Sequence, residues 1–229
     1  SLLREHRQEI IDGIVLSLRT PLGGLLGSTT LAEVASGDRL NELNFEMGLA
    51  ALSQGIMVNN IGKVLVRCLE RDGRSNDVLM PYARTLASDA FAVPLFGLMN
   101  GSIDTLIRFS QDAQQRLFIT DWKSNRLDED GMAYVIDGYS RESMVNAMEH
   151  HHYPLQALIY GTAVHRYLRS RSVDGKPLPA IAGMAYFFIR GMVGEPTPTE
   201  NEHRHGVFTW EAPKGLWQEL SDEISGAGK

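Results

Sequence analysis

The chain has 229 residues, of which 43% are hydrophobic, and its 22 Lys and Arg residues against 28 Asp and Glu residues give a net charge of −6. This size and composition allow one substantial core, and we expect residues 1–229 to form a single domain. The acidic balance argues against a free-standing DNA binder, which is expected to be basic. Affinity for DNA would have to come from a local patch or from another domain.

Hydropathy and cysteine content exclude further classes of protein. The sequence has no run of 18 apolar residues and no charged-then-apolar signal at its start, so it indicates neither a membrane span nor a secretory peptide. We therefore expect a cytoplasmic protein. The lone Cys68 cannot form an internal disulfide or a thiolate metal site, and we interpret it as a small buried hydrophobic residue.

The predicted elements alternate between helices and strands. In chain order, the sequence predicts a helix over residues 1–18, a strand over 40–49, helices over 62–71 and 77–90, strands over 101–109 and 117–123, helices over 140–151 and 155–169, a buried strand over 181–190 and a helix over 214–225. Two loops rich in Pro and Gly, residues 172–177 and 194–201, are interpreted as excursions from one fold. Strands interleaved with helices predict an α/β fold with a mixed central sheet flanked by helices.

The strands over residues 101–109 and 117–123 carry the most informative residues. Both alternate apolar and polar side chains, and the seven residues between them are polar and contain no proline. An antiparallel hairpin is the simplest arrangement of two such strands. In that hairpin Asp104 and Asp121 become neighbours. Lys123, two residues after Asp121, emerges on the same face of its strand.

Two carboxylates and a lysine are the groups that metal-dependent phosphodiester hydrolysis needs. Carboxylate oxygens hold a hard divalent cation, which activates water and offsets the charge that develops on the phosphate. A lysine nearby can position the nucleophile or stabilise the pentacovalent phosphate. Acidic and basic residues also alternate on ordinary solvated strands, so the pattern alone leaves that simpler explanation open.

Three consecutive motifs identify a family. They are Gly101-Ser102-Ile103-Asp104, Asp121-Trp122-Lys123-Ser124-Asn125, and the run His152-Tyr153-Pro154-Leu155-Gln156 that continues to Tyr160. In this order they resemble the C-terminal nuclease domain of RecB, the beta subunit of exodeoxyribonuclease V. The resemblance covers roughly residues 43–192 and is closest over residues 101–171. It implies a restriction-endonuclease-like core of the PD-(D/E)XK superfamily.

The resemblance also implies roles for individual residues. Asp104, Asp121 and the main-chain carbonyl of Trp122 would bind Mg²⁺, with Mn²⁺ as a substitute, and Lys123 would be the catalytic lysine. Gln156 and Tyr160 would form the Gln-X-X-X-Tyr pair near the active site. They are four residues apart on a predicted helix and therefore share a face. Without the resemblance this pair would be interpreted as structural.

One family feature is missing from this sequence. The family uses a histidine ligand from an upstream Gly-Thr-X-X-His segment, and His6 is the only histidine before Asp104. His6 lies in a different context, so we interpret it as a solvated helix residue. We expect the chain to be a C-terminal fragment of a helicase-nuclease subunit, with weak nuclease activity that an N-terminal extension carrying the histidine would raise.

Basic residues could hold DNA at two places. Arg166, Arg169, Arg171 and Lys176 follow the Gln156 helix, and Arg67, Arg71 and Arg74 lie in an earlier helix. Both groups could contact phosphates, or they could be ordinary solvated helix faces.

Other polar residues are weaker candidates for the site. His150, His151 and His152 are consecutive, and consecutive helix residues point about 100° apart, so they cannot all face one ion. Only His152 matches a family position. Glu46 is a further acidic strand residue that we consider a weak candidate.

Three functions are compatible with these features. The first is a metal-dependent deoxyribonuclease of the exodeoxyribonuclease V type, acting in double-strand-break processing and recombinational repair together with helicase domains and other subunits. The second is a noncatalytic nuclease-fold module that binds DNA or a partner subunit, which the acidic charge and the missing histidine favour. The third is an independent endonuclease, disfavoured because no sequence-recognition element is evident.

Overall fold

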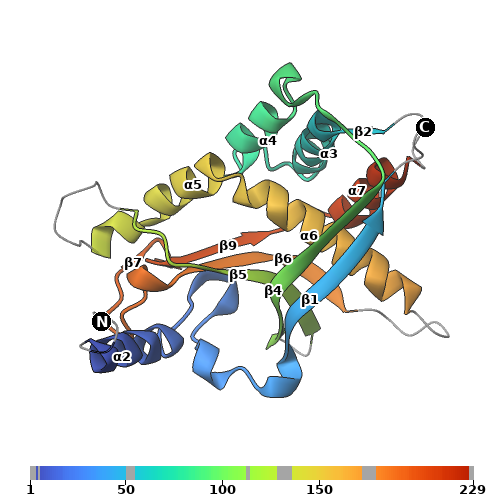
Figure 1. Ribbon diagram of the computed structural model, residues 1–229. Helices are drawn as coiled ribbons and strands as arrows, with labels where there is room; N and C mark the ends of the chain where they lie inside the picture. The colour runs from blue at the N-terminus through green and yellow to red at the C-terminus, as the bar shows by residue number, and fades with distance from the viewer. Residues whose placement is uncertain are drawn as a thin grey trace. The chain divides into compact units, whose positions relative to one another are not determined.

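A computed structural model describes residues 4, 6–49, 55–111, 114–127, 136–171 and 179–226 (Figure 1). Over these residues the helices are α2 (Arg7–Leu18), α3 (Val58–Arg71), α4 (Met80–Leu86), α5 (Arg141–His150), α6 (Tyr153–Ser170) and α7 (Leu216–Ser225). The strands are β1 (Arg39–Gly48), β2 (Ile56–Met57), β3 (Pro94–Leu95), β4 (Leu98–Gln111), β5 (Gln114–Lys123), β6 (Ala180–Phe188), β7 (Thr199–Glu200), β8 (His203–Arg204) and β9 (Val207–Glu211).

Five strands form one mixed sheet in the order β1-β4-β5-β6-β9. β4 and β5 are antiparallel, and so are β6 and β9. Between β5 and β6 the chain forms α5 and α6, which is the long helical connection that a crossover between two neighbouring strands requires. The predicted α/β class, with a mixed sheet and helices, is confirmed.

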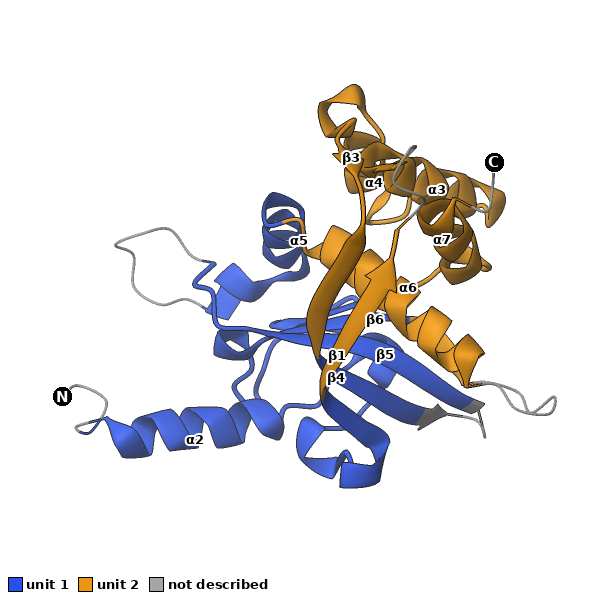
Figure 2. Ribbon diagram, turned by 45° about the vertical axis from the view of Figure 1, so that its right-hand side comes forward, with its two compact units in different colours: residues 1–41, 104–151, 183–211 blue, residues 42–103, 152–182, 212–229 orange. Residues whose placement is uncertain are grey.

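The chain divides into two compact units, each built from three separate segments (Figure 2). Unit 1 contains residues 1–41, 104–151 and 183–211, and unit 2 contains residues 42–103, 152–182 and 212–229. β1, β4 and β6 have residues in both units. The description below takes each unit by itself.

Unit 1 contains the hairpin of β4 and β5. In their antiparallel register Thr105 pairs with Thr120, and the pairing continues to Gln111 with Gln114. The strands are therefore longer than the sequence predicted, and the connection shrinks from seven residues to residues 112–113, which lie outside the described residues. Polar side chains do not end a strand whose backbone can still pair, because one face of an antiparallel ladder tolerates solvent.

Unit 2 combines a helical layer, formed by α3, α4, α6 and α7, with parts of the strands, and it has its own apolar core. α3 packs against α4 and α7, and α6 packs against α7. Met47, Ile56, Ala163 and Ile224 form one buried cluster, with Phe45 packed against it. Close approach of α6 and α7 depends on Gly161, since a Cβ there would lie 2.2 Å from Trp217 Cζ3.

The helix predicted over residues 77–90 is shorter in the structure. Its regular part is α4, Met80–Leu86. Asp77 forms a tight turn instead of a helical one, because its Oδ1 accepts a hydrogen bond from Leu79 N at 2.9 Å and its Oδ2 pairs with Arg74. Asp89–Phe91 forms a separate 3-10 turn. Side-chain to backbone hydrogen bonding of this kind competes with helix formation.

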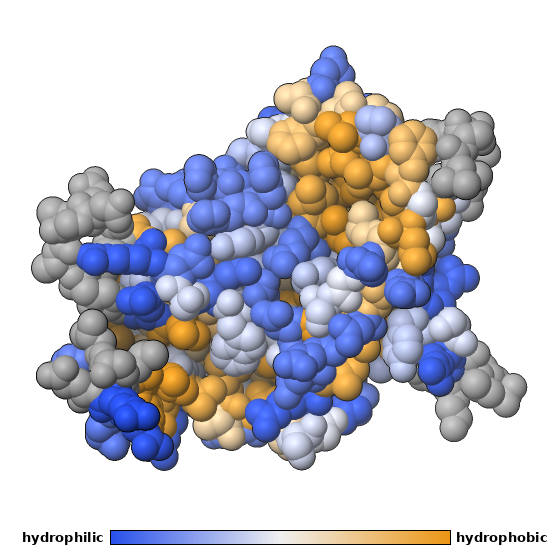
Figure 3. All heavy atoms as spheres, in the orientation of Figure 1, coloured by the Kyte–Doolittle hydropathy of each residue, from blue (hydrophilic) through white to orange (hydrophobic). Residues whose placement is uncertain are grey.

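Most of the exposed large apolar side chains in the described residues gather in two places (Figure 3). One is the segment of unit 2 that follows α4 and ends at the start of β4, where Val93, Phe96 and Leu98 are exposed. The other is α2 in unit 1, where Ile10, Ile14 and their neighbours are exposed. None of the helices within the described residues is long and apolar enough to cross a membrane.

Candidate functional site

The two aspartates predicted as metal ligands lie side by side in unit 1. Asp104 precedes Thr105 on β4, and Asp121 follows Thr120 on β5, so the pairing of the two threonines brings the carboxylates together. The Asp104 carboxyl is close enough to raise the pKa of Asp121. Asp104 is exposed, whereas Asp121 is only 3% exposed. One carboxylate is therefore open to solvent and the other is held inside the fold.

The environment of Asp121 favours its neutral form. Burial is the main cause, and it raises the pKa of the Asp121 carboxyl from 3.8 to about 6. The hydrogen bond from Lys123 acts in the opposite direction, while the neighbouring Asp104 raises the pKa further. Burial and a second carboxylate together create a demand for positive charge at this position.

Lys123 supplies part of that positive charge. Its Nζ donates a hydrogen bond to Asp121 Oδ2 at 2.9 Å, and both side chains are largely buried. The ammonium also lies 5.5 Å from the centroid of the Tyr186 ring on β6, within the range of a cation–π contact. These contacts fix the lysine beside the carboxylates, on the shared strand face that the sequence predicted.

Trp122 points to the opposite face of β5. Its ring lies 5.1 Å from that of Phe187, and its Nε1 donates to Thr105 Oγ1 at 3.4 Å. Phe187 and Tyr186 are adjacent on β6 and so lie on opposite faces, as do Trp122 and Lys123 on β5. The half-buried indole therefore packs on the opposite face of the sheet and does not crowd the carboxylates.

These residues suit a hard divalent cation. Such ions bind oxygen ligands, and Asp104 and Asp121 provide carboxylates. Burial and the neighbouring carboxylate disfavour the charged form of Asp121, as its raised pKa shows, and a bound cation would offset that effect. Within the residues that the structure describes, no group of three or more His, Cys, Asp or Glu side chains could hold a metal. The carboxylate pair is thus the minimum set that the sequence predicted, and metal binding stays a prediction.

Gln156 and Tyr160 meet in unit 2. Gln156 Nε2 donates to Tyr160 Oη at 3.0 Å, as their spacing of four residues on α6 predicted. The Tyr160 ring makes an edge contact with Phe45 on β1, with centroids 5.7 Å apart. Their role beside the carboxylates stays a prediction.

Arg166 and Arg169, predicted to bind DNA, have different surroundings. Arg166 is half-buried and donates to Gly48 O at 2.9 Å and to Ser221 O at 2.7 Å. Arg169 is exposed and donates to Gln218 Oε1. The guanidinium of Arg166 therefore joins three parts of unit 2, whereas that of Arg169 lies at the surface.

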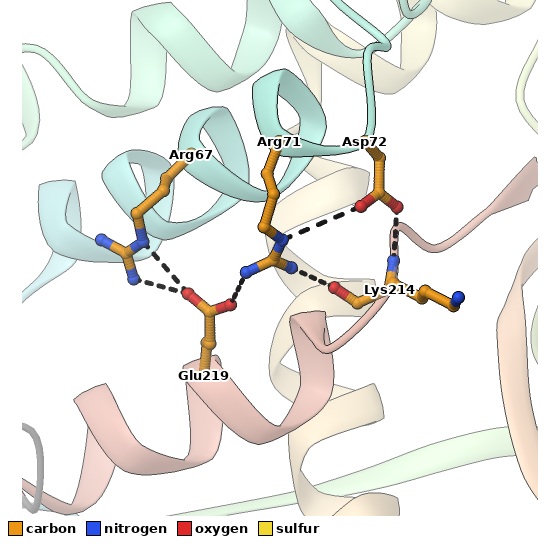
Figure 4. Close-up of polar contacts among 5 residues, drawn as sticks. All are labelled: Arg67, Arg71, Asp72, Lys214 and Glu219. Carbon is orange, nitrogen blue, oxygen red and sulfur yellow. Dashed lines mark hydrogen bonds and ion pairs between the residues drawn. The ribbon is translucent and has the colours of Figure 1, made fainter.

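The earlier basic group is engaged in ion pairs within unit 2 (Figure 4). Arg67 and Arg71 on α3 both donate to the Glu219 carboxylate on α7. Arg71 also donates to Lys214 O, and Lys214 N donates to Asp72 Oδ2 at 2.7 Å. Arg74 pairs with Asp77. These contacts favour the structural interpretation of the group over phosphate binding.

Most of the histidines that the sequence singled out have protein partners. His6 is exposed and pairs with Glu9 at 2.8 Å. His152 adopts a left-handed backbone conformation at the start of α6, and its Nδ1 lies 3.2 Å from Tyr82 Oη. The rings of His150 and His151 contact each other.

Two further candidates from the sequence, Cys68 and Glu46, and two tyrosines that the sequence did not indicate have defined positions in the structure. Cys68 is buried, as predicted. Glu46 is exposed on β1 in unit 2 and lines a cavity there. Sequence reasoning missed Tyr186, because contact with Lys123 depends on the pairing of distant strands. It also missed Tyr167, although the distance of seven residues from Tyr160 could have shown that both share a face of one helix.

Comparisons with known proteins agree with this architecture. No family model matches the chain. The RecBCD enzyme subunit RecB of Mycobacterium tuberculosis is 39% identical over 209 residues, which are 89% of this chain and 18% of the relative. The same subunit of Mycolicibacterium smegmatis is 37% identical over 218 residues, 93% of this chain and 19% of the relative.

A more distant match is the RecBCD enzyme subunit RecB of Escherichia coli, 33% identical over 131 residues, which are 57% of this chain and 10% of the relative. The chain spans about a fifth of the length of the two mycobacterial relatives. Similarity that extends over nine-tenths of the chain, together with the mixed sheet and its carboxylate-bearing hairpin, leads to one conclusion. The chain is a RecB-related domain.

Proposed function

We propose that this domain hydrolyses DNA phosphodiester bonds with the help of a divalent cation. The observation that supports the proposal is the group of Asp104, Asp121 and Lys123 at one end of the β4–β5 hairpin. Two carboxylates in contact, one of them buried and paired with a lysine, form an arrangement that is unfavourable in isolation and useful beside a cation and a phosphate.

Each residue has a distinct role in the proposed reaction. Asp104 and Asp121, with the main-chain carbonyl of Trp122, would hold Mg²⁺ or Mn²⁺. When bound, the cation supplies Lewis-acid activation of water and of the phosphate. Lys123 positions its ammonium where a phosphate oxygen gains charge. Phe187 and Thr105 fix Trp122, which keeps the backbone between the two functional side chains in place.

Relatives named as subunits of the RecBCD enzyme extend the proposal to a biological setting. We infer that the domain acts within a longer helicase-nuclease subunit, in a complex that processes DNA ends during recombinational repair. Such a setting accommodates the net charge of −6, because the other domains and subunits can supply much of the affinity for DNA.

The test is a cleavage assay on linear single-stranded DNA with Mg²⁺ and, separately, Mn²⁺. Lys123→Ala is expected to lower the cleavage rate by ~10²–10³, the usual effect of losing one positioned charge in a transition state. Asp121→Asn keeps the shape of the side chain and is expected to abolish cleavage. Lys63→Ala and Asp12→Asn are matched controls, because both residues are exposed and lie on helices, whereas the site residues lie on the strands of the hairpin. Parent-like rates in both site variants would contradict the proposal.

A noncatalytic module is the second candidate. The lack, within the described residues, of a third His, Cys, Asp or Glu side chain beside the carboxylate pair favours it. The module would bind DNA or a partner subunit without cleaving DNA. Calorimetric titration of Mg²⁺ separates the candidates. Binding that disappears in Asp121→Asn supports the nuclease, while a parent protein that neither binds the ion nor cleaves DNA supports the module.

A further inference from the structure

Unit 2 contains a groove that has no role in the proposed reaction. It has a volume of about 380 Å³ and is lined by β1 and α6, including Phe45, Glu46, Val164, Arg166 and Tyr167. That volume falls within the range of small-ligand sites in proteins, which are mostly apolar with a few polar groups at the rim. The lining of this groove is likewise mostly apolar or aromatic, with Glu46 and Arg166 as its charged residues.

One face of α6 joins the groove to the Gln156–Tyr160 pair. Gln156, Tyr160, Val164, Tyr167 and Arg171 follow one another at intervals of three or four residues, so they form a stripe along the helix. Phe45 connects the two regions, because it lines the groove and also contacts the Tyr160 ring. An extended ligand in the groove could therefore follow α6 toward the pair.

Tyr167 is an unusual surface residue. Its side chain is 45% exposed, and the guanidinium carbon of Arg171 lies 5.3 Å from its ring centroid. An exposed aromatic ring beside an arginine is the combination that holds bases by stacking and phosphates by charge in proteins that bind single strands.

Charge along the helix fits an anionic strand. Residues 153–171 contain His165, Arg166, Arg169 and Arg171 but no Asp or Glu, although the whole chain has a net charge of −6. Arg171 is exposed, and its spacing of four residues places it on the Tyr167 side of the helix. Arg169 is also exposed, but it lies two residues from Tyr167 and donates to Gln218, so it faces away from the groove. The guanidinium of Arg166 donates hydrogen bonds to Gly48 O and Ser221 O. Arg166 therefore forms part of the groove wall and is not assigned to phosphate binding. Among the lining residues that the structure describes, Glu46 alone has a charge that opposes an anion.

We propose that this groove binds single-stranded DNA, with a base stacked on Tyr167 and a neighbouring phosphate held by Arg171. The proposal rests on the proposed function, because it assigns the domain a place to hold the strand that it cleaves. It adds a binding subsite in unit 2 that is separate from the carboxylates of unit 1. A duplex cannot use the site, since its bases are already stacked on each other.

Binding is tested without cleavage, by fluorescence anisotropy of a labelled oligothymidine in EDTA. Tyr167→Ala is expected to weaken binding about tenfold, and Tyr167→Trp to retain it, because stacking needs a ring and not a hydroxyl. Phe96→Ala is the matched control, since it removes another half-exposed aromatic side chain of unit 2 outside the groove. Glu46→Gln is expected to tighten binding, with the largest effect at low salt.

The outcomes separate this proposal from the nuclease proposal. In EDTA Asp121→Asn is expected to bind the oligonucleotide at least as tightly as the parent, because the change removes a negative charge. Its loss of cleavage therefore cannot come from weaker DNA binding. The groove assignment is overturned if Tyr167→Ala binds like the parent, if Phe96→Ala weakens binding equally, or if a duplex of the same length competes as well as the single strand.

Discussion

Asp121 is a buried acid whose ionisation depends on its neighbours, and metal binding should depend on it. Titration calorimetry with Mg²⁺ or Mn²⁺ at pH 7 is expected to show weak binding at one main site, which is lost in Asp121→Ala because water replaces a carboxylate ligand poorly. Affinity should fall as the pH drops below about 6, since the pKa of Asp121 is raised to about 6 and a metal ligand must be deprotonated. Unchanged affinity in the variant would refute the assignment of Asp121 as a ligand.

The same pKa has the opposite consequence for stability when no divalent cation is bound. The folded-state pKa of about 6 lies above the ordinary value of 3.8, so the folded protein binds a proton more tightly than the unfolded chain does. The stabilising effect is complete below pH 3.8 and is lost as the pH rises to about 6. The loss is on the order of 3 kcal/mol. Asp121→Asn should lack this component in melting curves recorded across that range.

Arg166 illustrates an arginine whose hydrogen bonds are structural. Its guanidinium donates to the main-chain carbonyls of Gly48 and Ser221 and to Ser221 Oγ. Arg166→Ala leaves these acceptors without their donor, and we expect a loss of ~2–3 kcal/mol in the free energy of unfolding. Denaturant-induced unfolding of the variant and the parent measures this loss. Arg169→Ala, which removes an exposed arginine of the same helix, should change stability by less than ~1 kcal/mol.

At the scale of elements, Glu219 joins α3 and α7 by accepting hydrogen bonds from Arg67 and Arg71. Burial raises the pKa of Glu219, but the hydrogen bonds from the two arginines outweigh it and leave the pKa below its ordinary value. The resulting stabilisation is present above pH 4.5 and is lost as the pH falls through the folded-state pKa. At pH 7 the free energy of unfolding of Glu219→Gln is expected to be about 1 kcal/mol lower than that of the parent. At pH 3 the two free energies should be closer together, and urea melts at both pH values measure them.

Elements with strong local patterns could be predicted from the sequence. The hairpin of β4 and β5 followed from alternation of residues, and it places Asp104, Asp121 and Lys123 together because all three are close in sequence. The Gln156–Tyr160 contact followed from helical spacing. Contacts of Lys123 with Tyr186 and of Arg166 with Ser221 join residues far apart in sequence, so no local pattern could reveal them. The start of α4 also escaped prediction, because the turn at Asp77 depends on its side-chain hydrogen bonds.

At the scale of the whole molecule, the chain passes between its two compact units five times. Neither unit is a continuous stretch of sequence, so complete unfolding of one unit must disturb the chain segments that lead into the other. We expect one cooperative thermal transition, with a van't Hoff enthalpy equal to the calorimetric enthalpy, about 160 kcal/mol near 60 °C for a chain of this size. Differential scanning calorimetry provides both values. Two resolved transitions would show that the units are separate domains.

The burial of Cys68 has a consequence for measuring motion. Burial, and then the nearby charge of Glu219, raise the pKa of this thiol to about 11, so a reagent cannot react with it in the closed structure. As the sole cysteine of the chain, it reports the opening of the helical layer around α3 without any engineered label. The rate of its modification by a thiol reagent gives the free energy of that opening. Comparing this value with the free energy of global unfolding would reveal whether α7 can leave α3 while the rest of the domain stays folded.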